Sequence, residues 1–124
     1  MKGYIQVYTG NGKGKTTAAF GQALRAQGAG FKIFIGQFVK GKTYNENIAI
    51  AKHLKNIIIK QYGLGCFIIN KPTDKDIEAA QKGLTEMKKV IQSGTYNMVI
   101  LDEVNIALYY KLFDAEEIVA LMKN

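Results

Sequence analysis

The chain has 124 residues, of which 48% are hydrophobic, and it carries a formal net charge of +7. This length supports one hydrophobic core, so we expect a single domain over residues 1–124. The single cysteine excludes an internal disulfide and no apolar run approaches the ~20 residues that cross a bilayer, so we expect a cytoplasmic protein without a membrane partner. The lysines are scattered, which favours solvated helix faces over nucleic-acid binding.

The first predicted strand covers residues 4–8, and a glycine-rich loop follows it. The next helix is expected to begin at Lys15 or Thr16 and to end at Gln27. Glycines let consecutive backbone N–H groups turn toward one anion, and the helix N-terminus and Lys15 add positive charge. The Thr16 hydroxyl is then placed to bind the magnesium of a polyphosphate. The loop therefore predicts phosphate binding, in preference to an ordinary turn, through Gly10, Asn11, Gly12, Lys13, Gly14, Lys15, Thr16 and Thr17.

The generic phosphate-binding pattern has a glycine where this chain has Thr9, so the match to that pattern is imperfect. Strands are expected at 32–38 and 56–61, with a short helix at 44–54 between them. Thr43 and Glu46 have the spacing of a capping box for that helix, which we favour over a ligand contact by Glu46.

The longest predicted helix begins after Thr73 and ends at Gly94. Thr73 and Asp76 have capping-box spacing, and one face carries the apolar residues Ile77, Ala80, Leu84, Met87 and Ile91. Gly83 costs this helix on the order of 1 kcal/mol, which indicates close packing at that position.

A second chemical motif is the apolar run at 97–101, which ends in Asp102 and Glu103. We expect a strand that is buried on both faces and that carries its terminal carboxylate to the metal. A last helix is expected to begin at Asp114, with Glu117 completing a capping box, and to bury Ile118, Leu121 and Met122.

This alternation of strands and helices predicts an α/β fold, with a mainly parallel sheet and helices on both faces. Ligands bind such sheets beyond the carboxyl ends of the strands. The glycine-rich loop, 37–41, 63–67 and 102–105 all follow predicted strands. We therefore expect these four segments to form one site.

Residues 10–21, 37–41 and 99–108 resemble the ATP:corrinoid adenosyltransferases, in the order in which that family carries them. The shifted glycines are the family's own variant of the loop. The resemblance implies a P-loop NTPase (RecA-like) fold that lacks the family's C-terminal strand or strands. The family's proteins continue beyond the position of Asn124, so a fragment, a naturally short form and completion by dimerisation are all open.

The resemblance implies transfer of the 5′-deoxyadenosyl group of ATP to the cobalt(I) of a reduced corrinoid, with release of triphosphate. The cobalt is the nucleophile, so the protein has to orient the ribose and stabilise the departing triphosphate. Lys15 and Glu103 are the implied catalytic residues, and Thr16, Asp102 and Glu103 the implied Mg²⁺ ligands. The implied partners are ATP, cob(I)alamin or a related corrinoid, an electron donor for cobalt and a second copy of the chain in a homodimer.

The corrinoid-side candidates are Gln37, Lys40, Phe67 and Asn105. Asn105 either orients Glu103 or caps the following helix. Relatives carry an aromatic pair with a tryptophan after the third strand, whereas this chain has no tryptophan and offers Phe67 there.

Two other functions remain open on the residues alone. One is a P-loop ATPase that acts on nucleic acid, with Glu103 activating water. The other is an ATP-binding module without catalytic activity.

Overall fold

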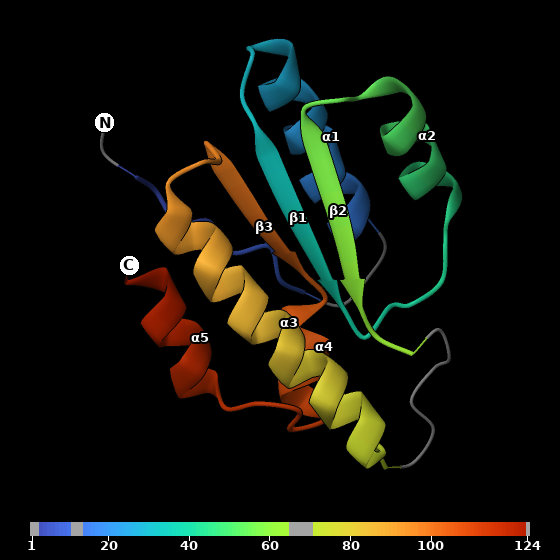
Figure 1. The fold of residues 1–124 in the computed structure, drawn as a ribbon, viewed down its shortest axis with the longest axis vertical. Coiled ribbons are helices and arrows are strands. Elements are labelled where there is room, and N and C mark those ends of the chain that lie inside the picture. The colour runs from blue at the N-terminus through green and yellow to red at the C-terminus, as the bar shows by residue number, and fades with distance from the viewer. Residues whose placement is uncertain (1–2, 11–13, 65–70, 124) are drawn as a thin grey trace.

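The computed structural model describes residues 3–10, 14–64 and 71–123. Within these residues, three parallel strands form one sheet in the order β2-β1-β3 (Figure 1). The strands are β1 (Ile33–Phe38), β2 (Ile57–Tyr62) and β3 (Met98–Asp102). The helices are α1 (Lys15–Gly28), α2 (Asn45–His53), α3 (Asp74–Ser93), α4 (Val104–Tyr109) and α5 (Ala115–Met122). The expected α/β class with a parallel sheet is confirmed.

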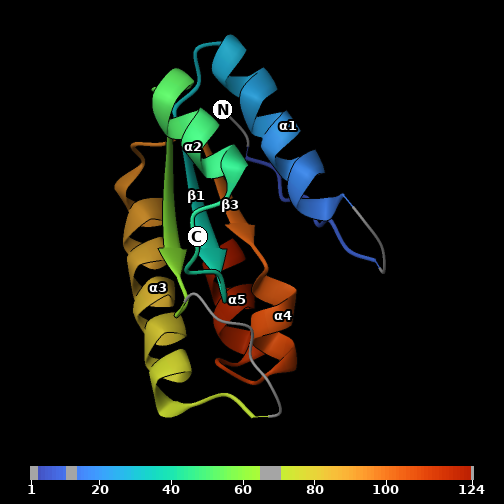
Figure 2. The same ribbon diagram turned by 90° about the vertical axis from the view of Figure 1, so that its right-hand side faces the viewer.

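The central strand β1 is buried on both faces because helices cover the sheet from both sides (Figure 2). Ile33 and Ile35 pack with the buried residues of α1 and α2. Phe34 and Phe38 face the opposite way and pack with the buried residues of α3, α4 and α5. Side chains alternate between the faces of a strand, so β1 contributes to two separate hydrophobic clusters.

The predicted limits of α3 are confirmed by its two caps. The Thr73 hydroxyl accepts a hydrogen bond from the Asp76 N–H at 3.2 Å, and the Asp76 carboxylate accepts one from the Thr73 N–H at 2.8 Å. Gly94 ends the helix with a left-handed backbone at φ 68°. Gly83 packs against the ring of Tyr62, which a β-carbon at this position would overlap. The close packing inferred from Gly83 is therefore present.

Two helix predictions were wrong in detail. The Asp114–Glu117 capping box of α5 forms, and Ile118 and Leu121 are buried, but Met122 is 38% exposed because it lies at the rim of the apolar stripe. Tyr44, one residue after Thr43, is the N-cap of α2, and no side chain in the described part of the chain caps that helix. The expected capping box of Thr43 and Glu46 does not form, because Thr43 lies outside the cap position.

The prediction of a strand at residues 4–8 was also wrong. This segment has no strand structure, and the side chains of Tyr4, Ile5 and Val7 are 82%, 61% and 69% exposed. Strand propensity favours an extended chain, but a strand also needs a hydrogen-bonded neighbour, and β3 is paired only with β1 among the described residues. As a sheet edge, β3 is half-buried from Met98 to Leu101 and not covered on both faces as expected.

No helix among the described residues is long and apolar enough to cross a membrane.

Candidate functional site

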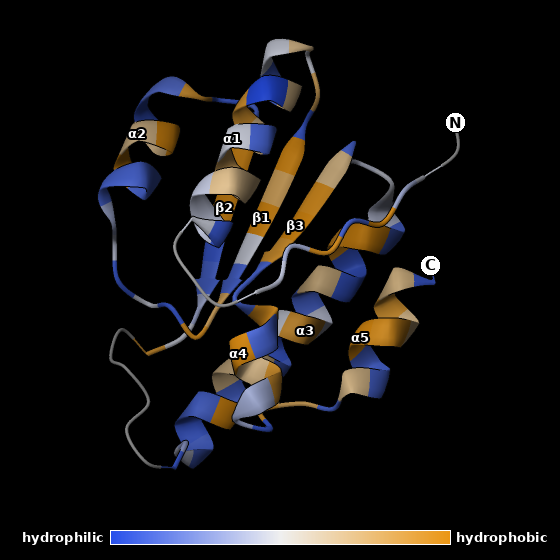
Figure 3. Ribbon diagram, turned by 180° about the vertical axis from the view of Figure 1, so that it is seen from behind, coloured by the Kyte–Doolittle hydropathy of each residue, from blue (hydrophilic) through white to orange (hydrophobic). Residues whose placement is uncertain are grey.

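A row of polar side chains crosses the sheet near the carboxyl ends of its strands. The strand pairing places Gln61 of β2 beside Gln37 of β1, and Gln37 beside Asp102 of β3. All three lie on the face toward α1 and α2, because they follow the apolar residues of that face at two-residue spacing. Figure 3 shows the strands changing from hydrophobic to hydrophilic colours at these ends. Parallel strands thus bring residues distant in sequence to one edge.

Asp102 is the centre of this row and is only 7% exposed. Its Oδ1 accepts a hydrogen bond from the Thr16 hydroxyl at 2.9 Å. Its Oδ2 accepts from the Gln37 side-chain amide at 3.0 Å and from the Lys40 ammonium at 3.3 Å. The Thr16 oxygen also lies 3.4 Å from Oε1 of Glu103. The first turn of α1 therefore meets the acidic end of β3.

Lys40 adds a positive charge to the same group of atoms. Its ammonium lies 3.6 Å from the Glu103 carboxylate, in addition to its ion pair with Asp102. It also donates to the Thr16 hydroxyl at 3.4 Å, and it lies 5.5 Å from the centre of the Tyr44 ring. Lys40 thus joins the segments that carry Thr16 and the two carboxylates.

Gln37 is held by two amides that the sequence prediction did not include. Its side-chain oxygen accepts from Asn47 at 3.0 Å and from Gln61 at 3.2 Å, and Gln61 also donates to the Lys42 carbonyl at 2.6 Å. The signal for Gln61 was its place at the end of a predicted strand, level with Gln37 and Asp102. Asn47 gives no such signal, because its position depends on how α2 packs.

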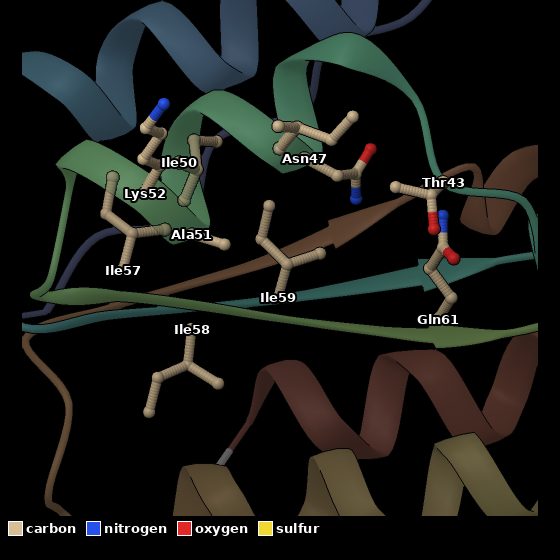
Figure 4. Close-up of a pocket in the computed structure, with 10 residues that line it drawn as sticks. Thr43, Asn47, Ile50, Ala51, Lys52, Ile57, Ile58, Ile59 and Gln61 are labelled. Carbon is tan, nitrogen blue, oxygen red and sulfur yellow. The ribbon is translucent and has the colours of Figure 1, made fainter.

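Asn47 and Gln61 also line a groove of about 740 Å³ between α2 and β2 (Figure 4). In that view they lie with Thr43 at one end of the groove, and isoleucines line the remainder together with Ala51 and Lys52. The side-chain oxygen of Asn47 is buried without a hydrogen-bond partner among the described residues.

The described part of the glycine-rich loop has the backbone that its glycines predict. Gly10 and Gly14 have φ of 135° and 103°, values that L residues rarely adopt. The Lys15 ammonium donates to the Gly10 carbonyl at 2.7 Å, across the loop. Gly14 is the N-cap of α1, and no side chain caps this helix among the described residues. Asn11, Gly12 and Lys13 lie outside the described residues.

The remaining predicted residues are distributed around this group. Thr17 is exposed on the first turn of α1, and Asn105 is exposed in α4. Glu103, with φ 64°, is the N-cap of α4, so the hypothesis that Asn105 caps this helix was wrong. Phe67 lies outside the described residues.

The oxygen atoms of Thr16, Asp102 and Glu103 fit a magnesium ion in chemical type. Hydroxyl and carboxylate oxygens are hard ligands, and Mg²⁺ binds one or two carboxylates together with phosphate and water oxygens. The Lys40 ammonium, itself a cation, lies among the same three groups. No cluster of three or more His, Cys, Asp or Glu is found within the described ranges. A metal bound here would therefore need the hydroxyl and ligands from substrate or solvent.

Comparison with known proteins agrees with this chemistry. The family model "ATP:corrinoid adenosyltransferase BtuR/CobO/CobP" matches residues 1–124. A corrinoid adenosyltransferase of Sinorhizobium is 38% identical to the chain over 126 residues, which cover 99% of this chain and 58% of the relative. For the corrinoid adenosyltransferase of Escherichia coli K12, these values are 36%, 99% and 62%. The chain thus spans about three fifths of the length of these curated relatives.

Proposed function

Because this chain belongs to the ATP:corrinoid adenosyltransferase family, we propose that it transfers the 5′-deoxyadenosyl group of ATP to a reduced corrinoid. In this reaction the electron pair of cobalt(I) forms a bond to C5′ of the ribose, the C5′–O bond breaks, and triphosphate leaves. The chain would then be a transferase with two substrates, ATP and cob(I)alamin or a related corrinoid.

The contact between Thr16 and Asp102 is the observation that carries this proposal. The two residues are 86 positions apart, yet the hydroxyl donates to the carboxylate at 2.9 Å. This contact joins the glycine-rich loop to the acidic end of β3, as a site for a nucleotide with its metal requires. It is independent support for the chemistry that the family match suggests.

The reaction requires little covalent chemistry of the protein, because the attacking atom belongs to the corrinoid. Residues 10–17 would bind the triphosphate through backbone N–H groups, with Lys15 opposing the charge that develops on the leaving group. Thr16, Asp102 and Glu103 would hold Mg²⁺, which when bound neutralises part of that charge. Glu103 would therefore act through the cation.

For the corrinoid side we retain Lys40, Phe67 and Asn105 as candidates, whereas Gln37 is too buried to contact a substrate. Gln37 is 1% exposed and donates to Asp102, so its role would be to hold that carboxylate in position. Asn105 is exposed beside Glu103 at the start of α4, where a large substrate could reach it.

We also propose a cytoplasmic homodimer that works with an electron donor, which reduces the corrinoid cobalt to cobalt(I). A single cysteine suits a reducing compartment. Tyr109 is 79% exposed and its ring lies 5.2 Å from that of Tyr110, and aromatic residues of this kind are enriched at protein interfaces.

The proposal is tested by an anaerobic assay with ATP and chemically reduced corrinoid. We expect the visible spectrum of an alkylated corrinoid, together with one triphosphate for each cobalt–carbon bond formed. Replacing Lys15 with alanine should lower the rate by at least about 100-fold, because it removes a charge that opposes the leaving group. Lys89→Ala, which removes an exposed lysine from α3, is the matched control and should keep the normal rate.

Near-normal adenosylation by the Lys15→Ala variant would contradict the assigned site. Orthophosphate released only in the presence of nucleic acid would instead indicate a motor ATPase. Tight ATP binding with neither product would indicate a binding module.

A further inference from the structure

We propose that Lys40 is an internal substitute for the divalent cation. Its ammonium group occupies the cation position while no metal is bound, and it has to leave when a metal enters. The inference rests on the proposed cation position beside Asp102, and it does not depend on adenosyl transfer. Lys40 thereby becomes a positioning residue that sets how tightly this site binds a metal before substrate arrives.

The contacts of the ammonium group carry the inference. It lies 3.3 Å from Asp102 Oδ2, 3.6 Å from Glu103 Oε1 and 3.4 Å from Thr16 Oγ1. These are the same three side chains whose oxygens fit Mg²⁺. An ammonium and a metal ion cannot share this space, because their charges repel and both require the same oxygens. Binding of one therefore excludes the other.

The local backbone shows that this placement is built into the fold. Val39, which precedes Lys40, has φ 68°, a left-handed conformation that is rare for a β-branched residue. The Lys40 N–H donates to the Phe38 carbonyl at 2.7 Å, which closes a tight turn immediately after β1. Gly63 leaves room for this turn, since a β-carbon there would overlap the Val39 carbonyl. The turn directs Lys40 toward the end of β3.

Without a cation, the two adjacent carboxylates would repel each other, and Asp102 is almost fully buried. Lys40 offsets this charge and keeps Thr16, Asp102 and Glu103 within reach of one another. The cost is a weaker affinity for a bare metal ion. A metal that arrives with a polyphosphate brings anionic oxygens, and these can pair with the displaced Lys40 ammonium. The site therefore favours the complex of metal and polyphosphate over the free metal ion.

The test is Mn²⁺ binding to the full chain, without nucleotide, followed by electron paramagnetic resonance. Lys40→Met should bind Mn²⁺ at least about tenfold more tightly than the wild type, because a charge within a few ångströms of the metal is removed. Lys60→Met is the matched control. It also removes one positive charge, but Lys60 is 56% exposed and pairs with Glu86 toward the opposite face. We expect its Mn²⁺ affinity to equal that of the wild type.

The difference between the Lys40→Met variant and the wild type should persist in about 0.5 M KCl, since partly buried charges are screened less than exposed ones. If Lys40→Met does not fold, Lys40→Gln has the same expected result. Asp102→Asn should remove the binding in every background.

The wild type and the Lys40 variants could bind Mn²⁺ with equal affinity, with Asp102→Asn removing the binding in each. This result would overturn the inference and leave the proposed function intact. Mn²⁺ binding that does not depend on Asp102 in any variant would overturn both this inference and the assigned cation position. Tighter binding by Lys40→Met in a chain that forms no cobalt–carbon bond would support the role of Lys40 and overturn the transferase.

Discussion

Gln37 connects Asp102 to two side chains on other elements of the fold. Its amide nitrogen donates to Asp102 from β3, and its oxygen accepts from Asn47 of α2 and Gln61 of β2. The side chain is 1% exposed, so water cannot replace these partners. One buried amide thereby fixes the Asp102 carboxylate relative to three elements of the fold.

Replacing Gln37 with leucine should lower the free energy of unfolding by about 1–3 kcal/mol, because buried donors and a carboxylate oxygen lose their partner. Urea denaturation followed by circular dichroism measures this change. Gln22→Leu on the exposed face of α1 is the matched control and should change the value by less than about 0.5 kcal/mol. Equal effects of the two substitutions would mean that the amide contacts do not stabilise the fold.

At the scale of elements, α3 approaches the sheet closely because Gly83 has no side chain. The ring of Tyr62 occupies the space that a β-carbon would need. The phenol of Tyr62 then reaches Glu86 on the same helix, to which it donates at 2.8 Å. A residue that weakens an isolated helix is therefore required for packing in the folded chain.

Gly83→Ala tests this packing. Alanine is the better helix former by about 1 kcal/mol, but forced contact with Tyr62 should outweigh that gain and destabilise the protein by about 1–3 kcal/mol. Gly21→Ala in α1 is the control, because nothing lies within 4 Å of the added carbon. It should stabilise the protein by about 0.4–1 kcal/mol, and thermal melts of both variants would measure the opposite signs. Stabilisation by both would contradict the close contact.

Most elements could be predicted from the sequence because local signals fix them. Thr73 with Asp76 and Asp114 with Glu117 define helix starts that depend on neighbouring residues alone. The segment at 4–8 shows the limit of this reasoning, since strand propensity contains no information about whether a neighbouring strand is paired with it.

Part of the candidate site could also be predicted from the sequence. The rule that parallel strands end at one edge brings Gln37 and Asp102 together without any side-chain detail. The ion pairs of Lys40 depend on the left-handed backbone of Val39 and on the space beside Gly63, which no residue pattern reveals. Asn47 likewise reaches Gln37 only through the packing of α2.

At the scale of the whole molecule, two hydrophobic clusters on opposite faces share the strand β1. The polar contact of Tyr62 with Glu86 joins the sheet to α3 on one of these faces. Burial, and then the Glu86 carboxylate, raise the pKa of Tyr62 well above its ordinary value of 10.0. The hydrogen bond from Tyr62 lowers the pKa of Glu86 below its ordinary value of 4.5.

These shifts predict how global stability depends on pH. The neutral phenol is favoured in the folded state, so its contribution is complete below pH 10.0 and decreases as pH rises further. The ionised Glu86 contributes above pH 4.5, and this contribution is lost as pH falls through its lowered pKa. The stability difference between wild type and Tyr62→Phe should therefore be constant between about pH 6 and 9 and decrease on both sides. Urea unfolding across the pH range measures it, and a difference that does not vary with pH would contradict the contact.

The site is assembled from parts of the chain that are separated by most of its length, as the hydrogen bond between Thr16 and Asp102 illustrates. Neither the glycine-rich loop nor the acidic turn contains this contact by itself, and a proteolytic fragment with one of them would lack it. A ligand that recognises the complete arrangement binds only the native population, so by mass action it protects the entire polypeptide from denaturation. The supply of such a ligand would thus govern how long each molecule stays folded.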